Sequence, residues 1–276
     1  MKDDFPQWAS VYEQKACQEI GRMIRRFKEV YPSLMMVYLP NASPERKVGN
    51  ILVAMEPSMK VWAKNPGEKE NEDAGKAKVD AGFRNFLLTV EDMILQFCAG
   101  NYLVGGYHIT DVSKIATMPN DARTIREQAW SGQKGLLIEE LALFGNNDCR
   151  IIPLGKKAGE WVEENLHGHA VLGNERVCEC TLHHSPAGRG HRGKAATNDK
   201  DGYRKFIDDW KQEDFVWYAR QCLDRMKNCE SVKTSLLEKL SVPFTRGGSY
   251  MNLAFTYKVD FEKISGERIP VPFGNG

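Results

Sequence analysis

The chain has 276 residues, 42% of them hydrophobic, and no continuous apolar run of ~18 residues, so we expect one globular domain without a membrane-spanning helix. The 38 basic and 37 acidic residues nearly cancel, which excludes a uniformly basic nucleic-acid-binding surface and leaves local basic clusters at 22–28, 60–78 and 189–194. Seven cysteines at irregular spacing, and a beginning without the apolar segment of a secretory signal, predict reduced thiols and a cytoplasmic location.

Helices and strands alternate along the predicted chain. Apolar residues at helical spacing predict helices, and short continuous apolar runs predict strands buried on both faces. In chain order we expect a helix at 8–31, a strand at 50–55, a charged loop or lid at 60–80, a helix at 83–97, a strand at 107–111, a helix at 121–144, a strand at 149–154, a helix at 156–166, a strand at 177–182 and a helix at 202–228. This order predicts an α/β protein, three-layer α/β/α, with a mainly parallel central sheet.

The C-terminal stretch shows a different pattern. Apolar residues alternate with polar ones over 253–261, and 268–273 could return as a partner strand whose prolines confine it to an edge. We therefore expect a C-terminal β-hairpin extension.

Three of the predicted strands end in side chains that can take part in chemistry. Glu56 follows the first strand, Asp111 ends the second, and His183 follows the fourth. Each residue alone suits a helix cap or a satisfied buried group. Because parallel strands bring their carboxyl ends to one edge of the sheet, the three together predict a functional site there.

The loop at 183–192 reads His-His-Ser-Pro-Ala-Gly-Arg-Gly-His-Arg. It combines a proton-handling side chain, a tight Ser-Pro turn, small residues and arginines directly after a predicted strand. Such a loop is typical of a phosphate grip beside a reacting centre.

Four segments follow one another along the chain: the strand followed by Glu56-Pro57, the strand that ends Ile-Thr-Asp, the segment Ile-Ile-Pro-Leu-Gly-Lys-Lys-Ala at 151–158, and the His-His-Ser-Pro motif. Their residues and their order resemble the uracil-DNA glycosylase superfamily. The resemblance covers 49–192. It implies a single glycosylase-like domain over 1–276. The N-terminal helix and the helical and β-hairpin extension at 202–276 belong to this domain but lie outside the region of resemblance. We expect a monomer that binds DNA, not membranes, and needs no cofactor or metal.

By this resemblance, Glu56 positions or activates the attacking water, and His183 stabilises the departing base at its O2. The chain departs from the family because no glycine accompanies Glu56, because His184 replaces a common proline, and because Ala187 stands where many members intercalate a leucine. The remaining site residues implied by the resemblance are DNA-backbone contacts at Ser58, Ser185, Arg189 and Arg192, and a base-stacking ring at Phe83 or Phe86.

Asp111 is the most informative departure. Relatives that act on uracil commonly have asparagine at this strand end. Cytosine presents an N4 amino donor and an N3 acceptor, so an aspartate can accept from N4 and, when protonated, donate to N3. When ionised it would repel uracil O4. Unless Asp111 merely caps the following segment, it indicates cytosine or a 5-substituted cytosine.

The sequence thus predicts a DNA glycosylase that hydrolyses the N-glycosidic bond of a flipped pyrimidine and leaves an abasic site. An enzyme for plain cytosine would attack the cell's own DNA, and some members of the family that this chain resembles remove heavily modified bases from bacteriophage DNA. A modified cytosine, such as glucosylated hydroxymethylcytosine, and a role in antiviral defence follow as expectations. The alternatives are a uracil-DNA glycosylase of base-excision repair, a non-catalytic binder of modified DNA, and a member that joins DNA covalently through His191.

Two further motifs resemble ligand-binding sites but have simpler explanations. Residues 188–193 match the dinucleotide-binding pattern G-x-G-x-x-G, but they come late in the chain and precede a polar segment. Histidines and cysteines gather at 167–191 and could supply zinc ligands. Cys178 and Cys180, however, would share one face of a strand, which is typical of core thiols.

Overall fold

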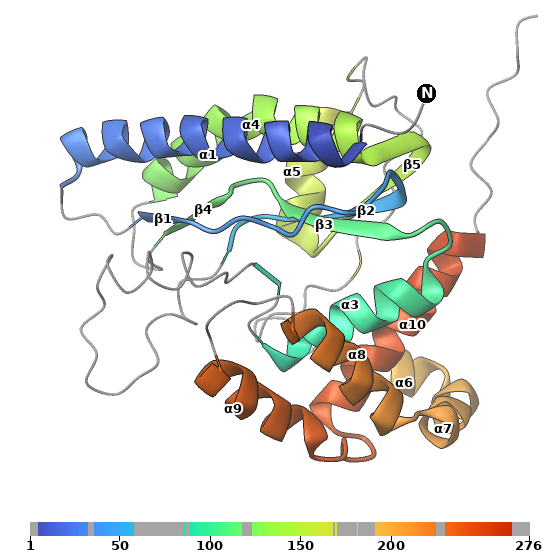
Figure 1. The fold of residues 1–276 in the computed structure, drawn as a ribbon. Helices are drawn as coiled ribbons and strands as arrows, with labels where there is room; N and C mark the ends of the chain where they lie inside the picture. The colour runs from blue at the N-terminus through green and yellow to red at the C-terminus, as the bar shows by residue number, and fades with distance from the viewer. Residues whose placement is uncertain are drawn as a thin grey trace, which may run out of the picture.

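The structure is a computed structural model that describes residues 5–32, 36–57, 85–86, 89–117, 123–167, 169, 181, 191–224 and 230–266. Its elements follow one another as α1 (Phe5–Val30), β1 (Met36–Tyr38), β2 (Val48–Ala54), α3 (Val90–Tyr102), β3 (Tyr107–Asp111), β4 (Ile115–Thr117), α4 (Arg123–Phe144), β5 (Gly145–Pro153), α5 (Lys156–Leu166), α6 (Lys194–Asn198), α7 (Lys200–Asp209), α8 (Gln212–Asp224), α9 (Glu230–Ser241) and α10 (Ser249–Gly266). Figure 1 shows α1 and α4 above the strands and α3 and α10 below them.

The central sheet has the strand order β3-β2-β5, and all its pairs are parallel. Parallel neighbours need a crossover, which α3 supplies between β2 and β3, and α4 between β3 and β5. Leu154 and Thr181 form a further parallel bridge beyond β5. The expected α/β class with a parallel central sheet is therefore confirmed.

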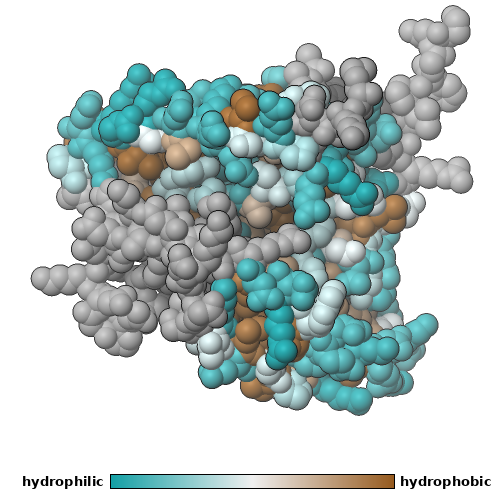
Figure 2. All heavy atoms as spheres, in the orientation of Figure 1, coloured by the Kyte–Doolittle hydropathy of each residue, from teal (hydrophilic) through white to brown (hydrophobic). Residues whose placement is uncertain are grey.

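Each face of the sheet has its own hydrophobic core. Ile51 and Val53 of β2 pack with residues of α1, α4 and α5, whereas Leu52 and Ala54 pack with residues of α3, α8 and α10. Successive residues of a strand point to opposite faces, so the continuous apolar run of β2 fills both cores. The result is compatible with a three-layer α/β/α arrangement. In Figure 2 hydrophilic residues cover much of the visible described surface, and hydrophobic ones show as smaller patches among them.

A small antiparallel pair that the sequence did not predict lies beside the main sheet. β1 pairs with β4, and the contact continues where the Leu39 amide donates to the Lys114 carbonyl oxygen over 3.0 Å. Asn41 follows this contact, and its Nδ2 lies 3.3 Å from Thr110 Oγ1 of β3. The pair thus brings Asn41 to the end of β3.

Two predicted helices have different boundaries. The helix expected at 83–97 begins at Val90, because Thr89 and Asp92 form a capping box that fixes its start. The helix expected at 202–228 is two helices, α7 and α8, separated at Trp210, whose backbone is extended (φ −68°, ψ 123°).

The predicted strand at 253–261 is wrong, because these residues belong to α10. Leu253, Phe255, Tyr257 and Phe261 are buried, but so are Met251 and Ala254 between or beside them. α10 packs closely on α3 and is buried around most of its circumference, so its apolar residues follow no single helical stripe and also satisfy a period of two. The expected partner strand at 268–273, like the loop at 60–80 and most of the strand at 177–182, lies outside the described residues.

Within the described part of the chain, no helix has the length and apolar character needed to cross a membrane.

Candidate functional site

The carboxyl ends of β2 and β3 lie side by side. Ala54 is in register with Asp111, and beyond them the Val112 amide donates to the Ala54 carbonyl over 2.8 Å and the Ser113 amide to the Met55 carbonyl over 2.9 Å. Asp111 ends β3, and Glu56 is the second residue after β2. The structure therefore brings these two chain positions to the same sheet edge.

Asp111 is a buried carboxyl with one oxygen in use. Its exposed fraction is 0%. Asn85 Nδ2 donates to its Oδ2 over 2.5 Å, while its Oδ1 is buried with no hydrogen-bond partner among the described residues. Burial raises the pKa of Asp111 to about 7, although Lys114, the hydrogen bond from Asn85 and the nearby Asn41 side chain act to lower it. Near neutral pH the carboxyl is therefore populated in both its protonated and its ionised form.

Sequence reasoning missed Asn41 and Asn85, the two amides that surround this carboxyl. The backbone N–H of Asn85 donates to the backbone carbonyl oxygen of Pro40 over 3.0 Å, so the segment with Asn41 and the segment with Asn85 are held together. Asn41 Oδ1, like Asp111 Oδ1, is a buried oxygen that lacks a partner within the part of the chain that the structure covers. Neither asparagine belongs to a periodic pattern or a motif, so the sequence carried no signal for them beyond the position of Asn85 next to Phe86.

Phe86, one of the two expected stacking residues, directly follows Asn85 in the chain. It is 4% exposed and belongs to the core on the α3 face of the sheet. Its φ of 61° is in the left-handed region, which a bulky residue seldom adopts, and Gln96 Nε2 donates to its carbonyl oxygen over 2.5 Å. Backbone strain of this kind collects at functional sites.

Glu56 is anchored differently. Its side chain is half-buried, and its Oε2 accepts a hydrogen bond from Trp130 Nε1 of α4 over 3.2 Å. Asp111 is instead held from the segment that precedes α3. The two carboxyl groups expected to work together are thus oriented by opposite helical layers.

A buried polar network lies on the α4 side of β3, centred on Glu140. Its Oε2 lies 2.6 Å from Lys114 Nζ, accepts from Thr110 Oγ1 over 2.9 Å and accepts from the Tyr12 hydroxyl over 3.1 Å. His108 Nε2 lies 2.9 Å from Oε1. Burial acts to raise the pKa of Glu140, but Lys114 and His108 together lower it to about 2, so the carboxylate is ionised.

Lys114 connects this network to Asp111. Besides its ion pair with Glu140, Lys114 Nζ donates to Thr110 Oγ1 and, over 3.1 Å, to the carbonyl oxygen of Asp111. The sequence did carry a signal here, because His108 and Thr110 are polar residues at alternate positions of a buried strand. Two polar groups on one face of a buried strand need partners in the layer above.

Arg192 does not suit the DNA-backbone contact predicted for it. Its side chain is 1% exposed, its Nη1 donates to Ser249 Oγ over 2.8 Å, and its Nη2 lies 3.6 Å from Glu91 Oε1. Thr256 Oγ1 also donates to its carbonyl oxygen over 3.1 Å. Because α10 and the first turn of α3 enclose the guanidinium, Arg192 fastens the loop before α6 to the core instead of facing a phosphate.

The other predicted site residues, Ser58, Phe83, His183, Ser185 and Arg189, lie outside the described residues. So does most of the histidine and cysteine cluster at 167–191. Among the residues that are described, no three histidine, cysteine or acidic side chains come together as a metal site would require. His191 is described and exposed.

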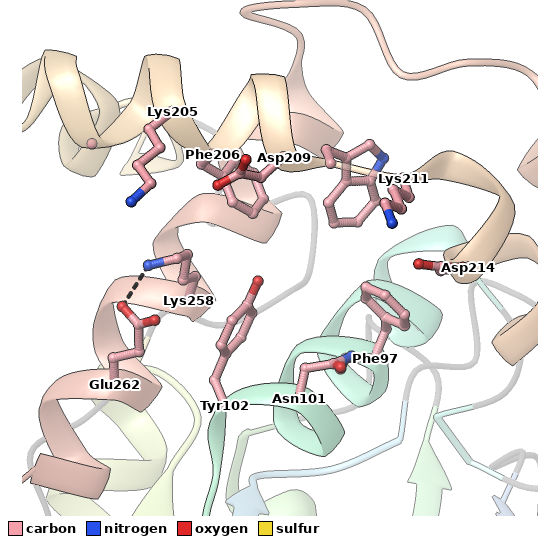
Figure 3. Close-up of a pocket in the computed structure, with 12 residues that line it drawn as sticks. Phe97, Asn101, Tyr102, Lys205, Phe206, Asp209, Lys211, Asp214, Lys258 and Glu262 are labelled. Atoms are coloured by element: carbon pink, nitrogen blue, oxygen red, sulfur yellow. Dashed lines mark hydrogen bonds and ion pairs between the residues drawn. The ribbon is translucent and has the colours of Figure 1, made fainter.

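A separate cavity of about 530 Å³ opens between α3, α7, α8 and α10 (Figure 3). Phe97 and Tyr102 line it from α3, and Lys258 pairs with Glu262 at its side over 2.5 Å. Its lining contains three lysines and three acidic residues, so it favours neither sign of charge. None of the predicted site residues lines it.

No protein-family model, no curated protein and no solved structure matches the chain. The comparisons therefore assign it to no family, and its likeness to the uracil-DNA glycosylase superfamily remains a likeness of sequence motifs.

Proposed function

We propose that the protein is a DNA glycosylase, with a uracil-DNA glycosylase-like fold, that hydrolyses the N-glycosidic bond of a flipped pyrimidine nucleotide. The observation that carries the proposal is the environment of Asp111. A fully buried carboxyl stands at the carboxyl edge of a parallel sheet, where α/β proteins bind ligands, and one of its oxygens has no partner in the described structure. An unused buried polar atom is costly, and a bound ligand is one way to satisfy it.

The preferred base is cytosine or a 5-substituted cytosine. With a pKa of about 7, Asp111 keeps a proton on a substantial fraction of molecules at neutral pH. The neutral carboxyl can donate to cytosine N3, which is an acceptor. A carboxyl with an ordinary pKa would offer no such donor.

The proposed reaction is hydrolysis at the sugar C1′. As the bond to the base lengthens, the sugar gains positive charge and the base leaves with the bonding electron pair. Glu56, oriented by Trp130, would offset the sugar's charge and take a proton from the attacking water, and His183 would donate a hydrogen bond to the departing base. The hydroxide oxygen bonds to C1′ as the bond from C1′ to the base breaks, and the base takes up a proton from solvent, so the products are a free base and an abasic sugar.

The target nucleotide must first leave the DNA stack, which costs a few kcal/mol. Stacking on an aromatic ring offsets part of this cost. Phe86 is the described candidate, because it directly follows Asn85, the residue that holds Asp111. The lid expected at 60–80 would border the pocket and leave room for a substituent at C5.

The experiment is release of bases from a panel of natural and bacteriophage DNAs, followed by mass spectrometry of the free bases. We expect a 5-modified cytosine and an abasic site from phage DNA that contains hydroxymethylated or glucosylated cytosine, and no loss of untreated bacterial plasmid DNA. Equal attack on both DNAs would contradict the role in antiviral defence. Failure to release any base from any DNA would overturn the glycosylase proposal, and a protein band shifted by covalently bound DNA would favour trapping instead.

A further inference from the structure

The amide of Asn41 is held in one orientation by Thr110. The Thr110 hydroxyl donates its single hydrogen to Glu140 Oε2 over 2.9 Å, and Glu140 can only accept because it is ionised. Thr110 Oγ1 therefore offers lone pairs to its other neighbours, which must be donors. Lys114 Nζ is one such donor, and Asn41 Nδ2, at 3.3 Å, is the other.

The oxygen of the same amide consequently faces away from Thr110. Asn41 Oδ1 is buried and has no hydrogen-bond partner in the described ranges, and the same holds for Asp111 Oδ1. Asn41 also acts to lower the pKa of Asp111, so the two side chains are close neighbours. A fixed acceptor thus stands beside a carboxyl that donates when protonated and accepts when ionised.

The groups around Asp111 fit this division of roles. Lys114 lowers its pKa and Glu140 raises it, while the neutral Asn85 donates a hydrogen bond to it and the neutral Asn41 lies close by. Because its protonation can change, Asp111 can satisfy the N3 of cytosine or the N3–H of uracil. Asp111 alone is therefore a weak discriminator between the two bases.

We propose that Asn41 determines specificity, because its Oδ1 accepts a hydrogen bond from the exocyclic amino group of a base whose ring nitrogen contacts Asp111. This inference rests on the proposed function and names the part of the base that is read. The cytosine N4 amino group adjoins N3 and matches the pair. Uracil would place O4 against Asn41 Oδ1, and two acceptors repel each other whatever the protonation of Asp111. A substituent at C5 leaves this edge unchanged.

Thr110 has the role of a positioning residue. Thr110→Val keeps the shape of the side chain but removes the hydroxyl that anchors Asn41 Nδ2. The amide can then turn over and present its NH₂ group to uracil O4. Thr110→Ser retains the hydroxyl, so it should restore the discrimination that Thr110→Val loses.

The experiment measures binding without reaction. The full chain is titrated with short single-stranded oligonucleotides that carry one 2′-fluoroarabino nucleotide, either cytosine or uracil, whose fluorine slows cleavage of the glycosidic bond. We expect the natural protein to bind the cytosine probe about tenfold or more tightly than the uracil probe. Asn41→Leu and Thr110→Val should bring the ratio of dissociation constants close to one, and Thr110→Ser should keep it. Asn101→Leu, an exposed change on α3 at a residue that bonds within its own helix, should also keep it.

The outcomes separate the two proposals. A folded Asn41→Leu variant that keeps the natural ratio overturns the specificity role, even if the enzyme releases cytosine. A natural protein that prefers the cytosine probe through Asn41 but releases no base from any DNA of the panel, phage DNA included, overturns the glycosylase and leaves the specificity role standing. Equal binding of both probes by the natural protein overturns the specificity role. If Asn41→Leu does not fold, the comparison of Thr110→Val with Thr110→Ser decides.

Discussion

Asn85 Nδ2 donates to Asp111 Oδ2 across 2.5 Å and so joins the segment before α3 to the last residue of β3. A hydrogen bond to the ionised carboxyl favours that form and acts against burial, which raises the pKa of Asp111 to about 7. Asn85→Leu should therefore raise this pKa further. If cytosine release needs the neutral carboxyl, the pH above which release declines should move upward. Single-turnover release measured across pH tests this, and an unchanged profile would contradict it.

Asp111 should make the protein less stable as the pH rises from about 4 to about 7. Its pKa is about 7 in the folded protein against an ordinary value of 3.8. Between these values the unfolded chain loses a proton that the folded protein keeps, so the free energy of unfolding falls by up to about 4 kcal/mol. Asp111→Asn removes this loss. In urea unfolding, the free energy of unfolding of the variant minus that of the natural protein should be larger at about pH 8 than at about pH 4. A constant difference would show that Asp111 does not titrate as described.

Glu140→Ala should lower the free energy of unfolding by about 3–5 kcal/mol, because it leaves Lys114 buried without its carboxylate. The matched control is the adjacent Glu139→Ala, which removes an exposed ion pair with Lys15 and should leave stability nearly unchanged. Thermal and urea unfolding measure both variants. If both variants lost the same free energy of unfolding, the buried network around Glu140 would stabilise the protein no more than an exposed ion pair does.

Glu56→Gln and His183→Ala should each slow base release by about 10²–10⁴-fold, the usual contribution of a positioned proton-transfer group. Neither change should unfold the protein, which circular dichroism can check. Trp130→Phe removes the indole donor to Glu56 and should slow release less than Glu56→Gln does. Release at the natural rate by both Glu56→Gln and His183→Ala would refute the assignment of the chemistry.

Arg192→Met should act on stability and not on DNA binding. Because the guanidinium is buried against Glu91 and Ser249, its loss should lower the free energy of unfolding by about 3 kcal/mol. The dependence of DNA affinity on salt should stay the same. Arg189→Ala, by contrast, should reduce the salt slope by about 1 if Arg189 contacts a phosphate. A reduced slope in Arg192→Met would restore the predicted backbone contact.

The sequence predicted the central sheet well, because continuous apolar runs leave few alternatives to buried parallel strands. The bounds of β3 and α5 agree with the prediction, and β2 and α4 differ from it by two residues or fewer at each end. α10 could not be predicted, since a helix buried around most of its circumference has no polar face to reveal its period.

The candidate site was predictable only in part. Asp111 and Glu56 were identifiable because they follow apolar strands. Asn41 and Asn85 were not, because their place depends on the pairing of β1 with β4 and on a contact between the segments at 40 and 85. Contacts of this kind are set by tertiary packing and leave no local pattern. Arg192 shows the converse error, since a basic residue in a glycine-rich loop resembles a surface contact until its burial is known.

The packing of α3 against α10 has a consequence for how the protein is made. Ser265 Oγ donates to the Tyr102 carbonyl oxygen over 2.8 Å, and Cys98 Sγ lies 3.6 Å from the Ala254 carbonyl oxygen. These partners are 163 and 156 residues apart in the chain, so α3 is synthesised well before the α10 residues that cover it. Long-range contacts of this kind slow folding. The segment that carries Asn85 and Phe86 leads directly into α3, so the growing chain would acquire a settled sheet edge around Asp111 only after α10 has been made.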